Sequence, residues 1–281
     1  MSLFKKNVPP QSGGGPAVRA AAVSDVGRVR RNNEDNFLLG QTIHETCADR
    51  AAISLSVPGS LTGWLLAGVF DGMGGGRKGE VAALWAAETF RDAAGSLAGV
   101  REPEAVDRII RAAFQQANNR VLPLRTEFGA YGTTGTVVCT NGVMFKLYSL
   151  GDSRGYLLRN HDLFQLTRDH TLARMKIDAG AYGEDDPQAR RDRHRLTEYI
   201  GRDESGGSIG PEESQWIRVM PGDNILLCSD GLYDMCANAE IAAIMNAGAE
   251  PRSRAARLAE RAKEQGGTDN VTCICLEFAG Q

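Results

Sequence analysis

The sequence predicts an α+β fold in which antiparallel sheets are covered by helices. The chain has 281 residues, enough to bury a large core without disulfide or metal staples. Its segments run strands, two helices, strands, two helices and a last strand, which does not fit the strand–helix alternation of a parallel sheet. Hydrophobic residues at 42% and charged residues at 24% are typical of a globular protein. The chain shows no internal repeat that would favour a solenoid.

The first half of the chain is predicted to form strands followed by a pair of helices. The apolar run 64–70 has the length of a buried strand and stops at Asp71 and a glycine cluster. An alanine-rich segment with helical spacing follows it. The predicted elements are strands at 17–25, 36–40 and 64–70, a candidate strand at 51–57 within the connection 44–63, and helices at 78–97 and 104–121.

The second half adds short strands, a polar insertion and a second pair of helices. Asn141-Gly142 and 160–162 are turn signals between strands. Residues 181–213 are rich in charge and glycine and poor in large apolar residues, which predicts an exposed flap. The predicted elements are strands at 135–140, 143–150, 154–159, 163–166, 216–219, 224–228 and 271–278, and helices at 240–246 and 252–265.

Charge and composition exclude several classes of protein. A formal charge of −3 and a pI near 5.9 give no basic footprint for nucleic acid or for an anionic membrane. No segment has the length of apolar chain that crosses a bilayer. Residues 1–16 lack an apolar run behind their lysines, so we interpret them as a flexible leader and not as a secretory signal. The six cysteines form no CxxC pair and are predicted to be reduced core residues, which favours a cytoplasmic protein.

Acidic residues recur at the ends of predicted strands, beside glycine. A carboxylate there is held by a rigid element yet points into solvent, and glycine lets a backbone carbonyl or an ion approach. Converging carboxylates repel one another unless a hard cation such as Mg²⁺ or Mn²⁺ neutralises them. Asp-Gly is also an ordinary turn dipeptide, so the pattern leaves a metal site and a set of plain turns both open. The residues in question are Glu34, Asp35, Asp71, Asp152, Asp230 and Asp269.

Seven segments, in this order, make the chain resemble one phosphatase family. They are VRRNNED, VFDGMGG, GTTGTVV, LGDSRGYLL, LTRDHT, CSDGLYDM and GGTDNVT, spread over residues 24–278. Together they are similar to the successive motifs of the bacterial PP2C (PPM) metal-dependent protein serine/threonine phosphatases. The resemblance implies a four-layer αββα sandwich of two antiparallel sheets flanked by helix pairs, formed by residues 17–281. It also implies two Mn²⁺ or Mg²⁺ ions, with a third, weaker ion site.

The resemblance also assigns roles to individual residues. Asp71 would bridge two ions, and the Gly72 carbonyl would be a further ligand. Arg30 would bind the substrate phosphate, and Asp35 would orient water on the metals. The remaining residues would act as follows: Glu34 on one ion, Asp230 and Asp269 on the other, Asp152 with Asp230 on the third, and Asn270 as support for the Asp269 loop.

The implied reaction is direct attack of a metal-bridging hydroxide on phosphorus, without a covalent phospho-enzyme. Where many eukaryotic members of the family have a histidine, this chain has Met73, which cannot donate a proton. The proton role is then vacant or filled by water on the metals, with His194 as an alternative donor. His170 is expected to make structural hydrogen bonds, whereas His44 and His161 are expected to be exposed. Arg190, Arg191, Arg193 and Arg195 are expected to form a solvated face, or else to meet acidic substrate.

Two other functions stay open at this point. A pseudophosphatase would bind phosphoproteins without turnover, although the complete set of acidic residues argues against it. A phosphatase of a small metabolite would keep the chemistry and change the substrate. We expect phosphorylated proteins as partners, together with a bacterial serine/threonine kinase whose action the phosphatase opposes, and a monomeric, cytoplasmic protein that binds neither nucleic acid nor membrane.

Overall fold

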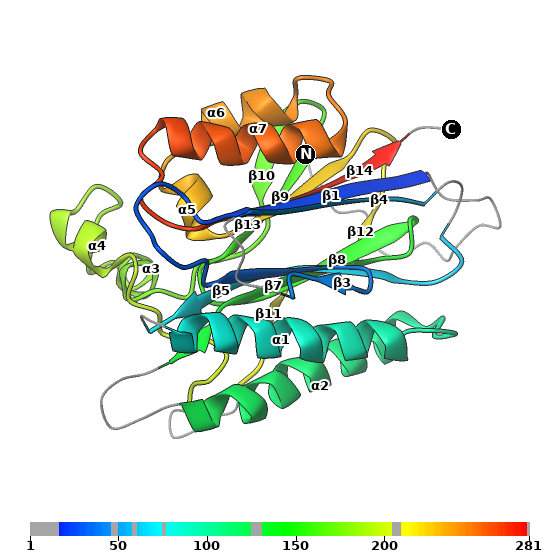
Figure 1. Cartoon of the computed structure of the whole chain (residues 1–281), viewed down its shortest axis with the longest axis horizontal. Helices are drawn as coiled ribbons and strands as arrows, with labels where there is room; N and C mark the ends of the chain where they lie inside the picture. The colour runs from blue at the N-terminus through cyan, green and yellow to red at the C-terminus, as the bar shows by residue number, and fades with distance from the viewer. Residues whose placement is uncertain are drawn as a thin grey trace.

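The fold is a layered sandwich of two antiparallel sheets between helices, as Figure 1 shows for this computed structural model. The structure describes residues 17–45, 50–57, 61–74, 77–124, 131–203 and 209–279. The predicted leader at 1–16 and Cys47 lie outside these residues. From top to bottom in Figure 1 the layers are α6 and α7, the first sheet, the second sheet, and α1 with α2. The prediction of an α+β sandwich is confirmed.

The first sheet contains six strands within the described residues, all paired antiparallel. The helices α6 (Asn238–Met245) and α7 (Pro251–Glu264) cover its outer face. In spatial order the strands are β10 (Asp162–Gln165), β9 (Arg154–Arg159), β13 (Asn224–Cys228), β14 (Val271–Ala279), β1 (Ala17–Asp25) and β4 (Arg50–Val57).

The second sheet has the path β11–β8–β7–β5–β2–β3, and β12 and β6 pair beside it with β8 and β5. The helices α1 (Arg77–Ser96) and α2 (Pro103–Val121) cover its outer face, and the 3₁₀ turn η1 (Leu122–Leu124) follows α2. The strands are β11 (Glu212–Glu213), β8 (Met144–Leu150), β7 (Gly135–Thr140), β5 (Leu65–Met73), β2 (Asp35–Leu39), β3 (Thr42–Ile43), β12 (Ile217–Arg218) and β6 (Gly132–Thr133).

Three apolar layers hold the sandwich together, one between the sheets and one under each helix pair. In the layer under α1 and α2, the Phe90 ring packs against Phe70 in a tilted arrangement and against Phe114 edge to face, with centroids 5.3 and 4.8 Å apart. Because β5 lies between α1 and the other sheet, both of its faces are buried, which explains its unbroken apolar run. Within the described residues, no helix is long and apolar enough to span a bilayer.

Two predictions about single residues are wrong. The strand that was expected to stop at Asp71 continues to Met73, because Gly72 and Met73 pair with β6. His44 was expected to be exposed and is instead buried, with its ring stacked on Phe37 at 6.0 Å between centroids. The apolar environment of its ring comes from tertiary packing, which the polar local sequence does not reveal.

Candidate active site

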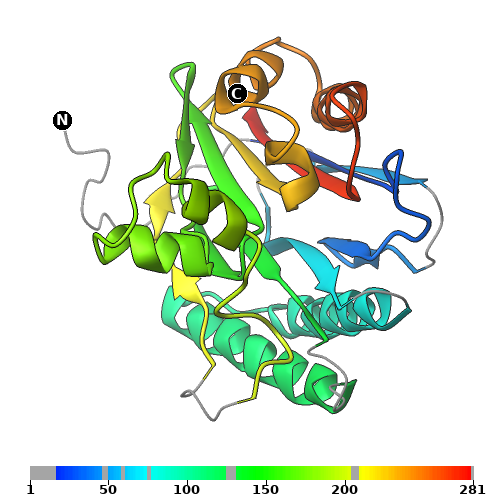
Figure 2. The same ribbon diagram turned by 90° about the vertical axis from the view of Figure 1, so that its left-hand side faces the viewer.

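Residues from several elements line one cavity at an end of the sandwich. Figure 2 looks onto that end, past the short helices α3 (Leu172–Asp178), α4 (Pro187–Asp192) and α5 (Asp230–Tyr233). The cavity has a volume of about 500 Å³. Its lining consists of Arg30, Glu34, Asp71, Gly72, Met73, Gly74, Arg193, His194, Asp230, Asp234, Met235, Thr268, Asp269 and Asn270.

Asp35 and Asp71 face each other across the ladder between β2 and β5, where they are direct register partners. The backbone of Asp71 is fixed on both sides: its N–H donates to Thr134 Oγ1 at 3.0 Å, and its carbonyl accepts from Thr134 N–H at 2.8 Å. Both hydrogen bonds involve the backbone of Asp71, and its carboxylate lines the cavity. Asp35 lies deeper, and its Oδ2 accepts from the Ser229 hydroxyl at 2.7 Å.

Glycine is required where α1 meets these strands. The Gly72 N–H donates to the Glu34 carbonyl at 3.2 Å, so the chain segments run close together. A Cβ on Gly72 would lie 2.6 Å from the Glu34 carbonyl oxygen and would also clash with the Gly79 carbonyl. The absence of a side chain therefore keeps the Gly72 backbone at the cavity wall, next to Glu34 and Asp71.

The loop before β14 brings Asp269 and Asn270 against the loop that carries Arg30. The Asn270 side chain accepts from Glu34 N–H at 2.8 Å and donates to the Val26 and Asn32 carbonyls, both at 2.9 Å. Arg30 donates to Asp269 Oδ2 at 2.6 Å, and both side chains are partly exposed. Asn270 therefore ties the two loops together, and Arg30 and Asp269 lie at the cavity mouth.

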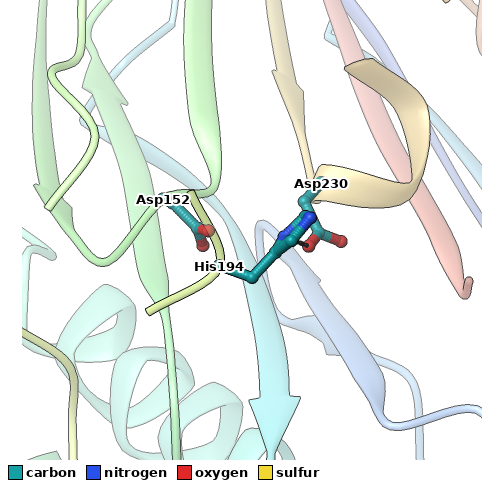
Figure 3. Close-up of side chains that lie close together, drawn as sticks. All are labelled: Asp152, His194 and Asp230. Atoms are coloured by element: carbon teal, nitrogen blue, oxygen red, sulfur yellow. Dashed lines mark ion pairs between the residues drawn. The ribbon is translucent and has the colours of Figure 1, made fainter. Parts of the chain in front are cut away.

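A second group of ligand-type side chains lies at the start of α5. One ligand atom each from Asp152, His194 and Asp230 lies within 4.8 Å of the other two (Figure 3). Asp152 follows β8, Asp230 begins α5, and His194 comes from the segment after α4. The His194 ring lies between two carboxylates, with Nδ1 3.4 Å from Asp230 and Nε2 3.3 Å from Asp234.

The electrostatics of the site favour cations. Burial raises the pKa of Asp35 to about 7, against hydrogen bonds from Ser229 and Thr272 that lower it. Burial, and next the nearby carboxylate charges, raise the pKa of Asp71 and Asp152 well above the ordinary range. Burial also raises the pKa of Glu34, partly offset by Arg30. A set of oxygen ligands that repel one another in this way fits hard divalent cations such as Mg²⁺ and Mn²⁺.

The structure brings together the residues that the sequence singled out. Glu34, Asp71, Gly72, Asp230, Asp269, Asn270 and Arg30 line the cavity, while Asp35 and Asp152 lie behind it among the same carboxylates. Met73 lines the cavity as well, where the sequence placed it.

Three charged or titratable lining residues were not assigned to the metal or phosphate site from the sequence: Arg193, His194 and Asp234. His194 was considered only as an alternative proton donor, and the arginine run only as a solvated face or a substrate contact. The signal for Asp234 was its position four residues after Asp230, because one turn of helix returns a side chain to the same face. His194 lies in a segment without periodicity, so only the fold could place it.

Other chemistry-bearing residues have structural roles. His170 Nδ1 accepts from Gly151 N–H at 3.1 Å, so it makes the structural hydrogen bond that was predicted. The five cysteines in the described residues are buried, and burial raises the pKa of Cys139, Cys228 and Cys273 above the ordinary value. Such thiols are poor nucleophiles, in agreement with their prediction as core residues.

Comparison with known proteins identifies a family match. The family model described as protein phosphatase 2C matches residues 45–265. A serine/threonine phosphatase stp from Listeria monocytogenes is 28% identical over 90% of this chain and 93% of its own length. The serine/threonine protein phosphatase PstP of Mycobacterium tuberculosis is 30% identical over 92% of this chain and 45% of its own length.

A solved structure extends the similarity to three dimensions. The catalytic domain of a serine/threonine protein phosphatase PstP, in complex with two manganese ions, matches with a TM-score of 0.70 and 29% identity. The match covers 94% of this chain and 99% of that structure. The similarity in three dimensions therefore extends over nearly the whole chain.

Proposed function

The chain belongs to the protein phosphatase 2C family, and from that premise we propose that it is a metal-dependent serine/threonine phosphatase acting on phosphorylated proteins. The observation that carries the proposal is the convergence of acidic side chains, with raised carboxyl pKa values, beside Arg30 in a cavity of about 500 Å³. A relative with 29% identity binds two manganese ions. Oxygen-rich sites of this kind take hard cations.

The residues present fit such ions. Asp71 would contact two ions, the Gly72 carbonyl and Glu34 would serve one of them, and Asp230 and Asp269 the other. Asp152, together with Asp230, would contribute to a third site. When bound, such ions lower the pKa of water and offset the charge of phosphoryl oxygens.

The side chains of the chain itself position the substrate and water. The planar fork of Arg30 can bind two phosphate oxygens at once, and it stands at the cavity mouth. Asp35, which accepts from the Ser229 hydroxyl, lies opposite Asp71 and would orient water there. Met73 has no proton to donate, so the leaving oxygen takes its proton from water. The buried cysteines take no part, and no phospho-enzyme forms.

The proposal includes the setting of this activity. Residues 17–281 act as one phosphatase domain, and residues 181–213 act as a flap beside the cavity that affects substrate choice more than the chemistry. The protein acts as a cytoplasmic monomer on phosphoserine and phosphothreonine placed by a bacterial serine/threonine kinase. The flap residue Arg193 lines the cavity, which supports a role of the flap in substrate binding.

The test is a phosphatase assay on the full chain with a phosphothreonine peptide and with p-nitrophenyl phosphate. We expect turnover of both in Mn²⁺, loss of turnover in EDTA, and recovery when Mn²⁺ is returned. Bound Mn²⁺ without turnover would contradict the enzyme and support a phosphoprotein-binding pseudophosphatase. Faster turnover of a phosphorylated metabolite than of the peptide would overturn the substrate class.

A further inference from the structure

We propose that His194 supplies a nitrogen ligand to the third ion site, and that an ion bound there holds the segment after α4 against the cavity. The inference rests on the proposed function, because it assumes that Asp152 and Asp230 bind a cation. It goes beyond that function in adding a ligand from the flap. It also makes the position of the flap depend on the choice of metal.

The distances allow one ion to contact all three side chains. Two ligand atoms bound at about 2.1 Å from one ion lie at most about 4.2 Å apart. The candidate ligand atoms of Asp152, His194 and Asp230 lie within 4.8 Å of one another. A movement of less than about 1 Å therefore brings all three into one coordination shell. Figure 3 shows that they come from three different segments.

The burial of Asp152 favours a cation beside its carboxylate. Its side chain belongs to a residue that is only 5% exposed, and in the described part of the chain no lysine or arginine pairs with its carboxylate. Arg154 is bound to Asp169 at 2.6 Å and Arg193 contacts Asp234 at 3.2 Å, so the basic side chain beside Asp152 is His194 itself. A buried carboxylate that has no lysine or arginine partner is costly, and a bound cation removes that cost.

The segment that carries His194 has few anchors to the rest of the site. It lies after α4, a helix of six residues, and next to the isolated bridge between Thr171 and Leu196. Its contacts at the cavity are made by His194 itself and by Arg193, through Asp230 and Asp234. A ligand bond from His194 would add a strong anchor. By linkage, ion binding and the closed position of this segment would then stabilise each other.

A nitrogen ligand also changes which metal the site prefers. Imidazole suits transition metals, whereas Mg²⁺ prefers oxygen ligands and retains water. A site formed by Asp152 and Asp230 alone would discriminate little between Mg²⁺ and Mn²⁺. With His194 as a ligand, the third site should favour Mn²⁺. The alternative is that His194 is only an ion-pair partner of Asp230 and Asp234, in which case it should not affect the third ion.

The experiment compares Mn²⁺ binding to the full-length wild type, His194→Ala and His194→Gln, with His161→Ala as the matched control. His161 is an exposed histidine in the turn between β9 and β10, so its loss removes an imidazole away from the cavity. Equilibrium dialysis and Mn²⁺ paramagnetic resonance report the number of ions and their affinities. Nitrogen coupling in the spin-echo spectrum of the third ion reports an imidazole ligand directly, and turnover need not be measured.

We expect three ions on the wild type, with nitrogen coupling on the weakest. Both His194 variants should lose that coupling and bind the third Mn²⁺ at least about tenfold more weakly, while His161→Ala should match the wild type. Mn²⁺ should also slow tryptic cleavage after Arg190 and Arg191, exposed residues of α4, in the wild type and not in the His194 variants.

The outcomes separate this inference from the proposed function. If the third affinity and its nitrogen coupling are the same in His194→Ala, the inference is wrong and the phosphatase stands. If the wild type turns over substrate with only two bound ions at saturating Mn²⁺, the inference is again overturned alone. If the wild type neither binds Mn²⁺ nor turns over substrate, the proposed function fails and the inference fails with it.

Discussion

The ion pair between Arg30 and Asp269 joins two residues that have separate tasks in the proposed reaction. Both side chains are substantially exposed, at 50% and 33%. Exposed ion pairs of this kind contribute only about 0.2–1 kcal/mol to stability, so breaking the pair requires little free energy. Binding a cation to Asp269 would therefore free the guanidinium for the phosphate at little cost. In this interpretation the pair is a resting arrangement of two functional groups.

Replacing Arg30 by alanine is expected to weaken phosphate binding. KM for a phosphothreonine peptide should rise about 10- to 100-fold, because hydrogen bonds to a charged group are lost, while kcat should fall less. Arg30→Lys should recover part of the loss, since it keeps the charge but not the fork. The control is Arg31→Ala, the exposed neighbour. Steady-state kinetics in Mn²⁺ measure the effect, and an unchanged KM in Arg30→Ala would remove Arg30 from the site.

Asp71→Asn should abolish most of the turnover, because it removes the charge on which two ions depend. We expect at least about a 100-fold loss of kcat, comparable to removing one strong electrostatic group from an active site. Asp162→Asn, at an exposed position of β10, is the control and should behave as the wild type. The p-nitrophenyl phosphate assay in Mn²⁺ measures both. Near-normal turnover in Asp71→Asn would refute its assignment.

At the residue scale, the sequence identified the site residues that stand in a recognisable local pattern. It did not identify the residues whose position depends on tertiary packing. Asp71 and Asp230 could be found because each comes at the end of an apolar run in the sequence and is followed by glycine. The sequence could not identify His194 as a site residue, because its charged sequence neighbours are typical of any solvated loop. His44 was predicted as exposed for the same reason, and its burial against Phe37 depends on packing between distant segments.

At the scale of elements, the packing of α1 on β5 positions the carboxylates. The first turn of α1 reaches the cavity end of β5, where a Cβ on Gly79 would clash with the Glu34 carboxylate and lie 3.2 Å from the backbone of Gly72. The alanine-rich face of α1, with Ala82, Ala83 and Ala86 fully buried, permits this close approach. The helix thus limits the space available to Glu34.

Two glycine-to-alanine changes in the same helix should have opposite effects. Gly79→Ala should cost about 1–3 kcal/mol of unfolding free energy by overpacking, and should weaken Mn²⁺ binding by displacing Glu34. In Gly95→Ala the added Cβ has no atom within 4 Å beyond its chain neighbours and the backbone of its own helix. This change should raise the unfolding free energy by about 0.5–1 kcal/mol, because alanine is the better helix former. Thermal unfolding and Mn²⁺ titration test both. Equal effects of the two changes would contradict the proposed packing.

The long elements were predictable and the short ones were not. The strands β7, β9 and β13 were predicted with their observed bounds, since each is an apolar run between clear turn signals. The short helices α3, α4 and α5 were missed, because four to seven residues are too few to show helical periodicity. Two of these three helices flank residues of the site, so the prediction was weakest beside the cavity.

At the scale of the whole molecule, the sandwich holds like charges together before any cation binds. The sheets meet at the cavity end, where Asp35 and Asp71 from one sheet approach Asp230 and Asp269 at strand ends of the other. The three apolar layers contribute the stability that opposes this repulsion. The site should therefore destabilise the metal-free protein, and metal ions should reverse the effect.

The pH dependence follows from the raised carboxyl pKa values. The pKa of Asp35 is raised by burial from 3.8 to about 7 in the folded chain, and burial and neighbouring carboxylate charges also raise the pKa of Asp71 well above its ordinary value. Between about pH 4 and 7 the folded state therefore holds more protons than the unfolded state, so stability falls as pH rises. Because the pKa of Asp178 is lowered to about 2, this residue changes the pH dependence of stability only below this window. Burial lowers the pKa of His44, so within this window His44 makes stability rise with pH, opposite to the carboxylates.

Comparing Asp71→Asn with the wild type in EDTA isolates the carboxylates, since His44 is common to both chains. Asparagine stays neutral, so the variant should become the more stable chain as pH rises from 5 to 7.5, by at most about 1.4 kcal/mol per pH unit. Each kcal/mol corresponds to about 2–4 °C in Tm for a chain of this size. Saturating Mn²⁺ should reverse the order, raising the Tm of the wild type more than that of the variant. If the Tm difference between the two chains changes neither with pH nor with Mn²⁺, these carboxylates do not form one charged cluster.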